Sequence, residues 1–129
     1  MAAVRRNGLY QCAIAGAGPA TIDVFRKRTS GNRYLREFQY PTANGEDPLP
    51  RVNEVSVPLS LYTGDGDTLV VPQESRAMST GLERAGKLVK LVILPDMEHT
   101  INTWIPANIG AVLTDIEAYL KTDCGPGGL

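Results

Sequence analysis

The chain has 129 residues, which suits one domain with a modest core. Hydrophobic residues make up 43% and charged residues 21%, and the net charge of −1 gives no electrostatic reason to bind nucleic acid or an anionic membrane. No apolar run approaches the length that spans a bilayer, and Met1–Arg6 has no apolar stretch of a secretory signal behind it. A cytoplasmic location is therefore expected, unless the native N-terminus lies upstream.

Three short apolar runs predict β-strands: Leu9–Ala15, Val57–Tyr62 and Leu88–Leu94. Each is nearly continuous rather than alternating, which is typical of strands that are buried on both faces of a parallel sheet.

Helices are expected between and after these strands. Pro72–Ala85 begins with proline and is followed by Gly86, and Asn108–Leu120 carries one apolar stripe that includes Leu113. The loop-like sequence Thr29–Asn32 interrupts Thr21–Arg36, so two short helices are predicted there.

The order of these elements predicts an α/β fold, with a three-stranded parallel sheet and flanking helices joined by right-handed crossovers. Segment Tyr40–Asn53 is rich in Pro, Gly and Asn and is expected to be a loop. Residues 1–122 form the expected folded unit, and residues 123–129 form an expected flexible tail.

The two cysteines are too few for a disulfide framework. Cys12 lies in the first predicted strand, where a small buried hydrophobe is the simplest interpretation, and Cys124 lies in the tail. We expect a reduced pair, with a Cys12–Cys124 disulfide as the alternative.

An acid and a base follow consecutive predicted strands. Asp67 ends the loop after Val57–Tyr62, where Gly64 and Gly66 are expected to turn the backbone through positive φ, and His99 is the only histidine. Carboxyl ends of neighbouring parallel strands meet at one edge, so Asp67 is expected to orient His99 as a general base. The alternatives are an Asp67 that only caps a turn and a histidine with no catalytic role.

Other chemistries have weaker support. Asp65, Asp67 and Glu74 supply too few oxygen ligands for a calcium site, and Gly16–Gly18 lacks the lysine and third glycine of a phosphate loop. We therefore expect no metal and no cofactor.

The Asp-then-His order matches the last two members of a Ser…Asp…His triad, but the sequence contains no Gly-x-Ser-x-Gly turn. The remaining candidate nucleophiles lack that glycine context: Cys12, Ser56, Ser60, Thr63, Ser75 and Ser79.

Several segments resemble the prolyl oligopeptidase (S9) family of serine peptidases, within the α/β-hydrolase superfamily. Val57–Val70 is similar to the family's VPLLLIHGxxDxxV, Glu83–Val89 to the end of its next helix (KAGKPV), and Pro95–His99 to its PGxxH turn. The resemblance implies the C-terminal part of a dipeptidyl aminopeptidase-like or acylaminoacyl peptidase-like catalytic domain, with a partial α/β-hydrolase fold. It also implies that Asp67 is the catalytic acid and His99 the catalytic base.

The chain departs from this pattern at three positions. Thr63 replaces the usual histidine, and Asp96 and Glu98 replace glycines of the histidine turn. The resemblance places the nucleophile turn upstream of Met1, so the expected function is a serine hydrolase of peptides or esters represented by its acid- and base-bearing half. The alternatives are a small stand-alone esterase with a recruited nucleophile, and a non-catalytic self-associating module.

In the resembled fold, Leu9–Ala15 would lie between the nucleophile strand and Val57–Tyr62. Without the nucleophile strand it becomes an apolar edge with unpaired backbone groups, which attracts another chain. A homo-oligomer, most simply a two-fold dimer, is therefore expected.

Overall fold

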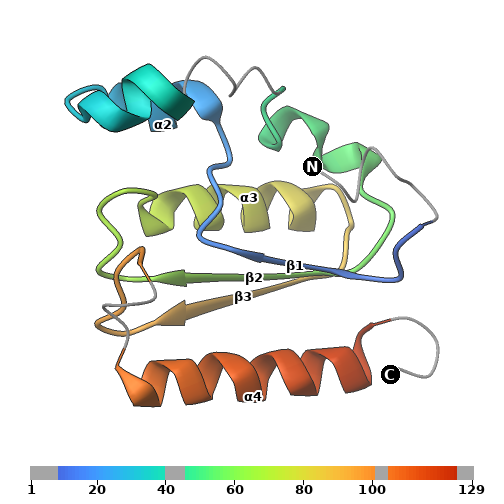
Figure 1. Cartoon of the computed structure of the whole chain (residues 1–129). Coiled ribbons are helices and arrows are strands. Elements are labelled where there is room, and N and C mark those ends of the chain that lie inside the picture. The colour runs from blue at the N-terminus through green and yellow to red at the C-terminus, as the bar shows by residue number, and fades with distance from the viewer. Residues whose placement is uncertain (1–8, 40–45, 101–104, 125–129) are drawn as a thin grey trace.

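A computed structural model describes residues 9–39, 46–100 and 105–124 (Figure 1). Its centre is a three-stranded sheet in the order β1-β2-β3, formed by β1 (Ala13–Gly16), β2 (Leu59–Gly64) and β3 (Val89–Leu94). All pairs are parallel, as predicted from the apolar runs. The first strand is shorter than predicted, because Leu9 and Tyr10 are exposed by 66% and 43% instead of entering the sheet.

Helices cover both faces of the sheet (Figure 1). Helix α3 (Pro72–Arg84) lies on one face and α4 (Pro106–Thr122) on the other, and each has a proline in its first turn. The predicted pair of short helices is present as α2 (Ile22–Arg28) and the π-helix η1 (Leu35–Gln39), separated by a turn. None of the described helices is both long and apolar enough to cross a bilayer.

The core has two parts. Leu59 and Leu61 of β2 pack with Met78 and Leu82 of α3, whereas Tyr62 packs on the opposite side with the cluster around Leu94, Met97 and Val112. This division follows from the alternation of side chains along a strand. The two helices thereby fix β2 as the buried centre of the molecule.

Helix α4 differs from its predicted stripe in one respect. Val112 and Tyr119 are buried as expected, but Leu113 is 61% exposed.

A 3-10 helix, η2 (Leu49–Glu54), lies in the segment that was predicted to be a loop. Its second position is a proline, which the first turn of a helix accommodates because no N–H bond is needed there. It packs on α3 at Gly81, where an added Cβ would lie only 2.9 Å from Cδ1 of Leu49. An alanine at position 81 would therefore collide with η2 unless Leu49 moved.

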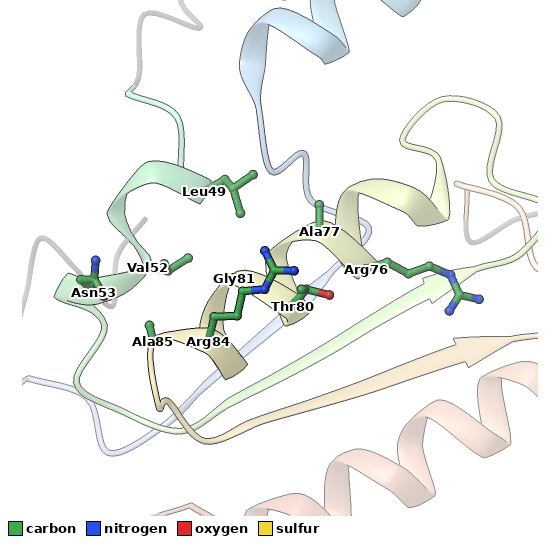
Figure 2. A pocket seen from close by; sticks show the side chains of 9 residues that line it. All are labelled: Leu49, Val52, Asn53, Arg76, Ala77, Thr80, Gly81, Arg84 and Ala85. Atoms are coloured by element: carbon green, nitrogen blue, oxygen red, sulfur yellow. The ribbon is translucent and has the colours of Figure 1, made fainter.

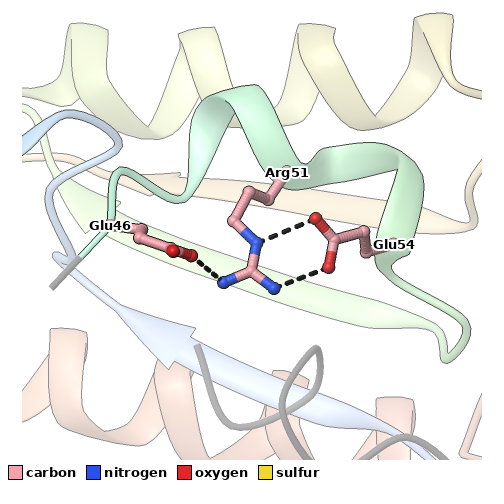
Figure 3. Close-up of polar contacts among 3 residues, drawn as sticks. All are labelled: Glu46, Arg51 and Glu54. Atoms are coloured by element: carbon pink, nitrogen blue, oxygen red, sulfur yellow. Dashed lines mark hydrogen bonds and ion pairs between the residues drawn. The ribbon is translucent and has the colours of Figure 1, made fainter.

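Arg51 of η2 forms ion pairs with two glutamates, Glu46 and Glu54 (Figure 3). The Arg51 guanidinium donates two hydrogen bonds to Glu54, at 2.8 and 2.6 Å, and also pairs with Glu46. The bond to Arg51 lowers the pKa of the Glu54 carboxyl. Because the Glu46 and Glu54 side chains are 70% and 51% exposed, these ion pairs are expected to add little to the stability of the fold.

The expected reduced cysteine pair is contradicted by the structure, in which Cys12 and Cys124 form a disulfide with their Cα atoms 5.0 Å apart. Helix α4 runs back along the sheet and returns the chain to the amino end of β1, where Cys12 precedes the strand rather than lying in it. Cys124, expected in the flexible tail, is only 6% exposed. Residues 125–129 of that tail lie outside the described residues.

Tyr119, near the end of α4, is buried and reaches β1. Its side chain is only 2% exposed, and its hydroxyl donates a long hydrogen bond of 3.5 Å to the Ala13 carbonyl oxygen of β1. Burial, together with the negative charge of Asp123, raises the pKa of Tyr119 to about 12. The end of α4 is therefore held to β1 by packing as well as by the disulfide.

We predict that reducing the disulfide, or replacing Cys12 and Cys124 together by serine, lowers the free energy of unfolding by about 2–5 kcal/mol, because the bridge closes a loop between residues 112 positions apart. Denaturant titrations with and without dithiothreitol measure this difference. The double-serine variant is the control, since the reductant should not change its midpoint. Equal stability of the oxidised and reduced protein would contradict the prediction.

Candidate active site

Asp67 lies in the loop that connects β2 to α3. Its carboxylate Oδ1 accepts hydrogen bonds from the N–H groups of Leu69 and Val70, at 2.9 and 2.8 Å. The residue is only 2% exposed. Asp67 thus caps a turn, as one alternative anticipated, but this role occupies only one of its two oxygens.

The second oxygen of Asp67 meets His99. Asp67 Oδ2 lies 2.8 Å from Nδ1 of His99, which confirms the predicted contact between the two side chains. A carboxylate only accepts hydrogen bonds, so the ring donates from Nδ1. The lone pair of the neutral imidazole is then on Nε2, and the histidine side chain is 32% exposed, against 0% for the aspartate. This is the arrangement of a general base whose tautomer is fixed by a buried acid.

Gly64 lets the two loops approach each other. An added Cβ there would lie 1.8 Å from the carbonyl oxygen of Met97, so the backbone that leads to His99 packs directly on the end of β2. The expected positive φ at Gly64 and Gly66 is wrong, because among the described glycines only Gly86 has one. Glycine is required at position 64 for close contact rather than for a special turn.

The turn between β3 and His99 has two supports that sequence reasoning missed. Asp65 accepts a hydrogen bond from the Asp96 N–H at 2.8 Å, and the Asn108 side-chain amide donates one to the Pro95 carbonyl oxygen at 2.8 Å. Asn108 is only 5% exposed, whereas the sequence pattern places it only at the start of a helix. A polar residue at the sheet-facing start of α4 was the available indication.

The three carboxylates considered above for a calcium site, those of Asp65, Asp67 and Glu74, each accept hydrogen bonds from different groups. Glu74 accepts hydrogen bonds from the Ala20 and Thr21 N–H groups, at 3.0 and 3.1 Å, and so ties the start of α3 to the segment after β1. Within residues 9–39, 46–100 and 105–124, no three His, Cys, Asp or Glu side chains are grouped so that they could hold a metal ion.

Gly16, which was considered above as part of a phosphate loop, packs against an aromatic side chain. An added Cβ at Gly16 would lie 2.1 Å from ring atoms of Tyr62, the residue opposite it in the sheet. Glycine at this position makes room for an aromatic ring.

The candidate nucleophiles are poorly placed for attack on a substrate. Ser60, Thr63, Ser75 and Ser79 are all at most 5% exposed, and Cys12 is oxidised. Ser56 is exposed but precedes β2, at the end of the sheet away from His99. None of these six residues is both exposed and placed at the carboxyl end of the sheet, where Asp67 and His99 lie.

The largest hollow among those described lies elsewhere (Figure 2). It has a volume of about 670 Å³ between η2 and α3, with Leu49 and Val52 on one side and Arg76, Thr80 and Arg84 on the other. Neither Asp67 nor His99 lines it. The acid–base pair instead lies at the carboxyl end of the sheet, where functional groups of open α/β sheets gather.

With this geometry established, comparison with known proteins identifies the family. The sequence profile described as "Prolyl oligopeptidase family" matches residues 1–126. The chain belongs to the prolyl oligopeptidase family. No curated protein sequence matches it significantly.

Solved structures confirm the α/β-hydrolase fold. The chain is similar to a Pyrococcus horikoshii acylaminoacyl peptidase, with a TM-score of 0.72, 16% identity and coverage of 95% of this chain and 21% of that one. It is also similar to a Mycobacterium tuberculosis puromycin-hydrolyzing peptidase, with a TM-score of 0.72, 16% identity and coverage of 97% of this chain and 20% of that one. A Pyrococcus furiosus esterase matches with a TM-score of 0.71, 19% identity and coverage of 95% of this chain and 48% of the esterase. The chain thus spans about a fifth of the two peptidases and about half of the esterase.

We predict that Gly64→Ala lowers the free energy of unfolding by about 2–3 kcal/mol or more, since the new methyl group cannot fit against the Met97 backbone. The matched control is Gly110→Ala on α4, where an added Cβ meets nothing within 4 Å and should stabilise the helix by about 0.5–1 kcal/mol. Urea titrations measure both changes. Similar stabilities for the two variants would contradict the close contact at Gly64.

Proposed function

We propose that the chain is the acid- and base-bearing C-terminal part of the catalytic domain of a serine hydrolase that acts on peptides or esters. The observation that carries the proposal is the 2.8 Å contact between His99 Nδ1 and buried Asp67 Oδ2, in a chain of the prolyl oligopeptidase family. The names of similar structures, which include acylaminoacyl peptidases and an esterase, support the same reaction class.

In the proposed reaction, Nε2 of His99 takes the proton of a serine hydroxyl as the oxygen attacks the substrate carbonyl. The same nitrogen then returns the proton to the leaving amine or alcohol. Asp67 keeps the Nδ1–H tautomer and stabilises the imidazolium that forms between these steps. The sequence contains no Gly-x-Ser-x-Gly turn, and under this proposal another polypeptide segment supplies the serine.

The isolated chain should therefore hydrolyse p-nitrophenyl esters and peptide p-nitroanilides near the background rate, because loss of the triad serine removes about 10⁶-fold of kcat. When the chain is co-expressed with the upstream half of a family member's catalytic domain, we expect ester hydrolysis that His99→Ala abolishes. Glu117→Gln, at a site of α4 where the side chain is 65% exposed, is the control and should leave that activity intact.

The stand-alone esterase remains the alternative, and a serine-directed phosphonate separates the two proposals. Robust ester hydrolysis by the pure chain, lost in His99→Ala and blocked by the phosphonate, would show that a hydroxyl of this chain is the nucleophile. No covalent adduct on the isolated chain is expected under the proposal. An adduct that appears only after co-expression with the upstream half would support it.

A self-associating chain is also proposed, and the exposed edge of the sheet supports it. Within the described residues β1 pairs only with β2, and Ala15 and Gly16 are exposed. Free strand edges of this kind pair with other chains. The four residues of β1 make this edge shorter than the predicted Leu9–Ala15.

We predict a dimer, measured by light scattering over a dilution series at micromolar concentrations. Ile14→Pro should shift the equilibrium toward the monomer, because proline lacks an N–H and disfavours strand pairing. Leu113→Ser is the control: it removes an exposed apolar side chain from α4 and should leave the monomer–dimer equilibrium unchanged. A monomer mass for the unmodified chain at all concentrations would overturn the proposal.

The proposed cytoplasmic location conflicts with one feature of the structure. Disulfides persist mainly in oxidising compartments, so the Cys12–Cys124 bridge favours such a compartment. Alkylation of thiols in intact cells, followed by mass spectrometry, distinguishes the two locations.

A further inference from the structure

The turn that follows β3 contains a backbone conformation that favours glycine. Asp96 has φ of 52°, in the left-handed region where most side chains are strained. The family pattern carries glycine at this position, whereas aspartate tolerates the conformation less readily than glycine does. Some interaction must therefore offset the strain three residues before His99.

Asp65 supplies that interaction from the neighbouring loop. Its Oδ1 accepts the Asp96 N–H at 2.8 Å, and its own N–H donates to the Leu94 carbonyl oxygen at 3.0 Å. The two bonds bracket Pro95, which has no N–H to donate. One residue thus fixes the backbone on both sides of the proline at the end of β3.

Asp65 also lies two residues before Asp67. The loop of β2 therefore holds the histidine turn at two points, by the Asp65 bond to the Asp96 backbone and by the Asp67 bond to the His99 ring. Asn108 supports the turn from the opposite side through the Pro95 carbonyl oxygen. A shift at Asp96 would move the backbone that carries His99 relative to Asp67.

We propose that Asp65 is a positioning residue, whose carboxylate holds Asp96 in its left-handed conformation and thereby keeps His99 Nδ1 on Asp67. Asp65 acts through the backbone and does not touch a reacting atom. The importance of this geometry for catalysis rests on the proposed function, but the placement of the ring can be measured without any reaction.

The single histidine of the chain makes that measurement simple. At alkaline pH, ¹⁵N NMR of the imidazole reports the ratio of the Nδ1–H and Nε2–H tautomers of His99. In Asp65→Ala we expect the Nδ1–H to Nε2–H ratio to fall roughly three- to tenfold, the equivalent of one lost hydrogen bond. Asp115→Ala, which removes a carboxylate paired with Lys90, is the matched control and should leave the ratio unchanged.

Two rescue variants separate positioning from a general loss of structure. Asp65→Asn retains an oxygen that can accept the Asp96 N–H and should keep most of the wild-type ratio. Asp96→Gly, added to Asp65→Ala, should restore the ratio because glycine adopts positive φ without support. Circular dichroism melts confirm that each variant is folded.

The proposal fails if folded Asp65→Ala keeps the wild-type tautomer ratio, or if neither rescue variant recovers it. Asp67→Ala distinguishes this failure from failure of the proposed function. A changed ratio in Asp67→Ala with an unchanged ratio in Asp65→Ala would refute only the role of Asp65. An unchanged ratio in Asp67→Ala would remove the acid–base pair on which the proposed function depends.

Discussion

The close approach of the Met97 backbone to Gly64 is the constraint on which the candidate site depends. It is possible because β2 and β3 are adjacent and parallel, so their carboxyl ends emerge side by side, and because position 64 carries no side chain. The contact brings two loops from distant parts of the sequence within hydrogen-bonding range of each other. Asp67 is buried in the process, and a buried carboxylate needs the partners that His99 and the following N–H groups provide.

The two members of the pair differ in their burial. Asp67 is enclosed and satisfied by three hydrogen bonds, so it is fixed in place and has no access to a substrate. The side chain of His99, in contrast, is 32% exposed. In the proposed reaction, the buried group would orient its partner and the more exposed group would transfer the proton.

Much of this arrangement could be predicted from the sequence, because it follows from local patterns. Continuous apolar runs indicate buried parallel strands, proline and glycine mark the ends of α3, and the strand-end rule brings Asp67 to His99. Features that depend on distant contacts could not be predicted. The packing of η2 against Gly81 joins two separate segments of the chain, and the hydrogen bond of Asp65 reaches a residue 31 positions away. The sequence suggests that Gly64 provides a special backbone conformation. Its actual role, to leave room for the Met97 backbone, is visible only in three dimensions.

The disulfide depends on the most distant contact of all, since its formation requires α4 to have the length and direction that return Cys124 to β1. It also changes the connectivity of the molecule. Between residues 12 and 124 the polypeptide forms a covalent ring that contains the whole sheet, both large helices and the Asp67–His99 pair. A protease that cuts one exposed bond in this ring, such as the bond between Ser30 and Gly31 in the turn after α2, releases no fragment while the bridge is intact. The nicked protein would separate into two pieces only under reducing conditions.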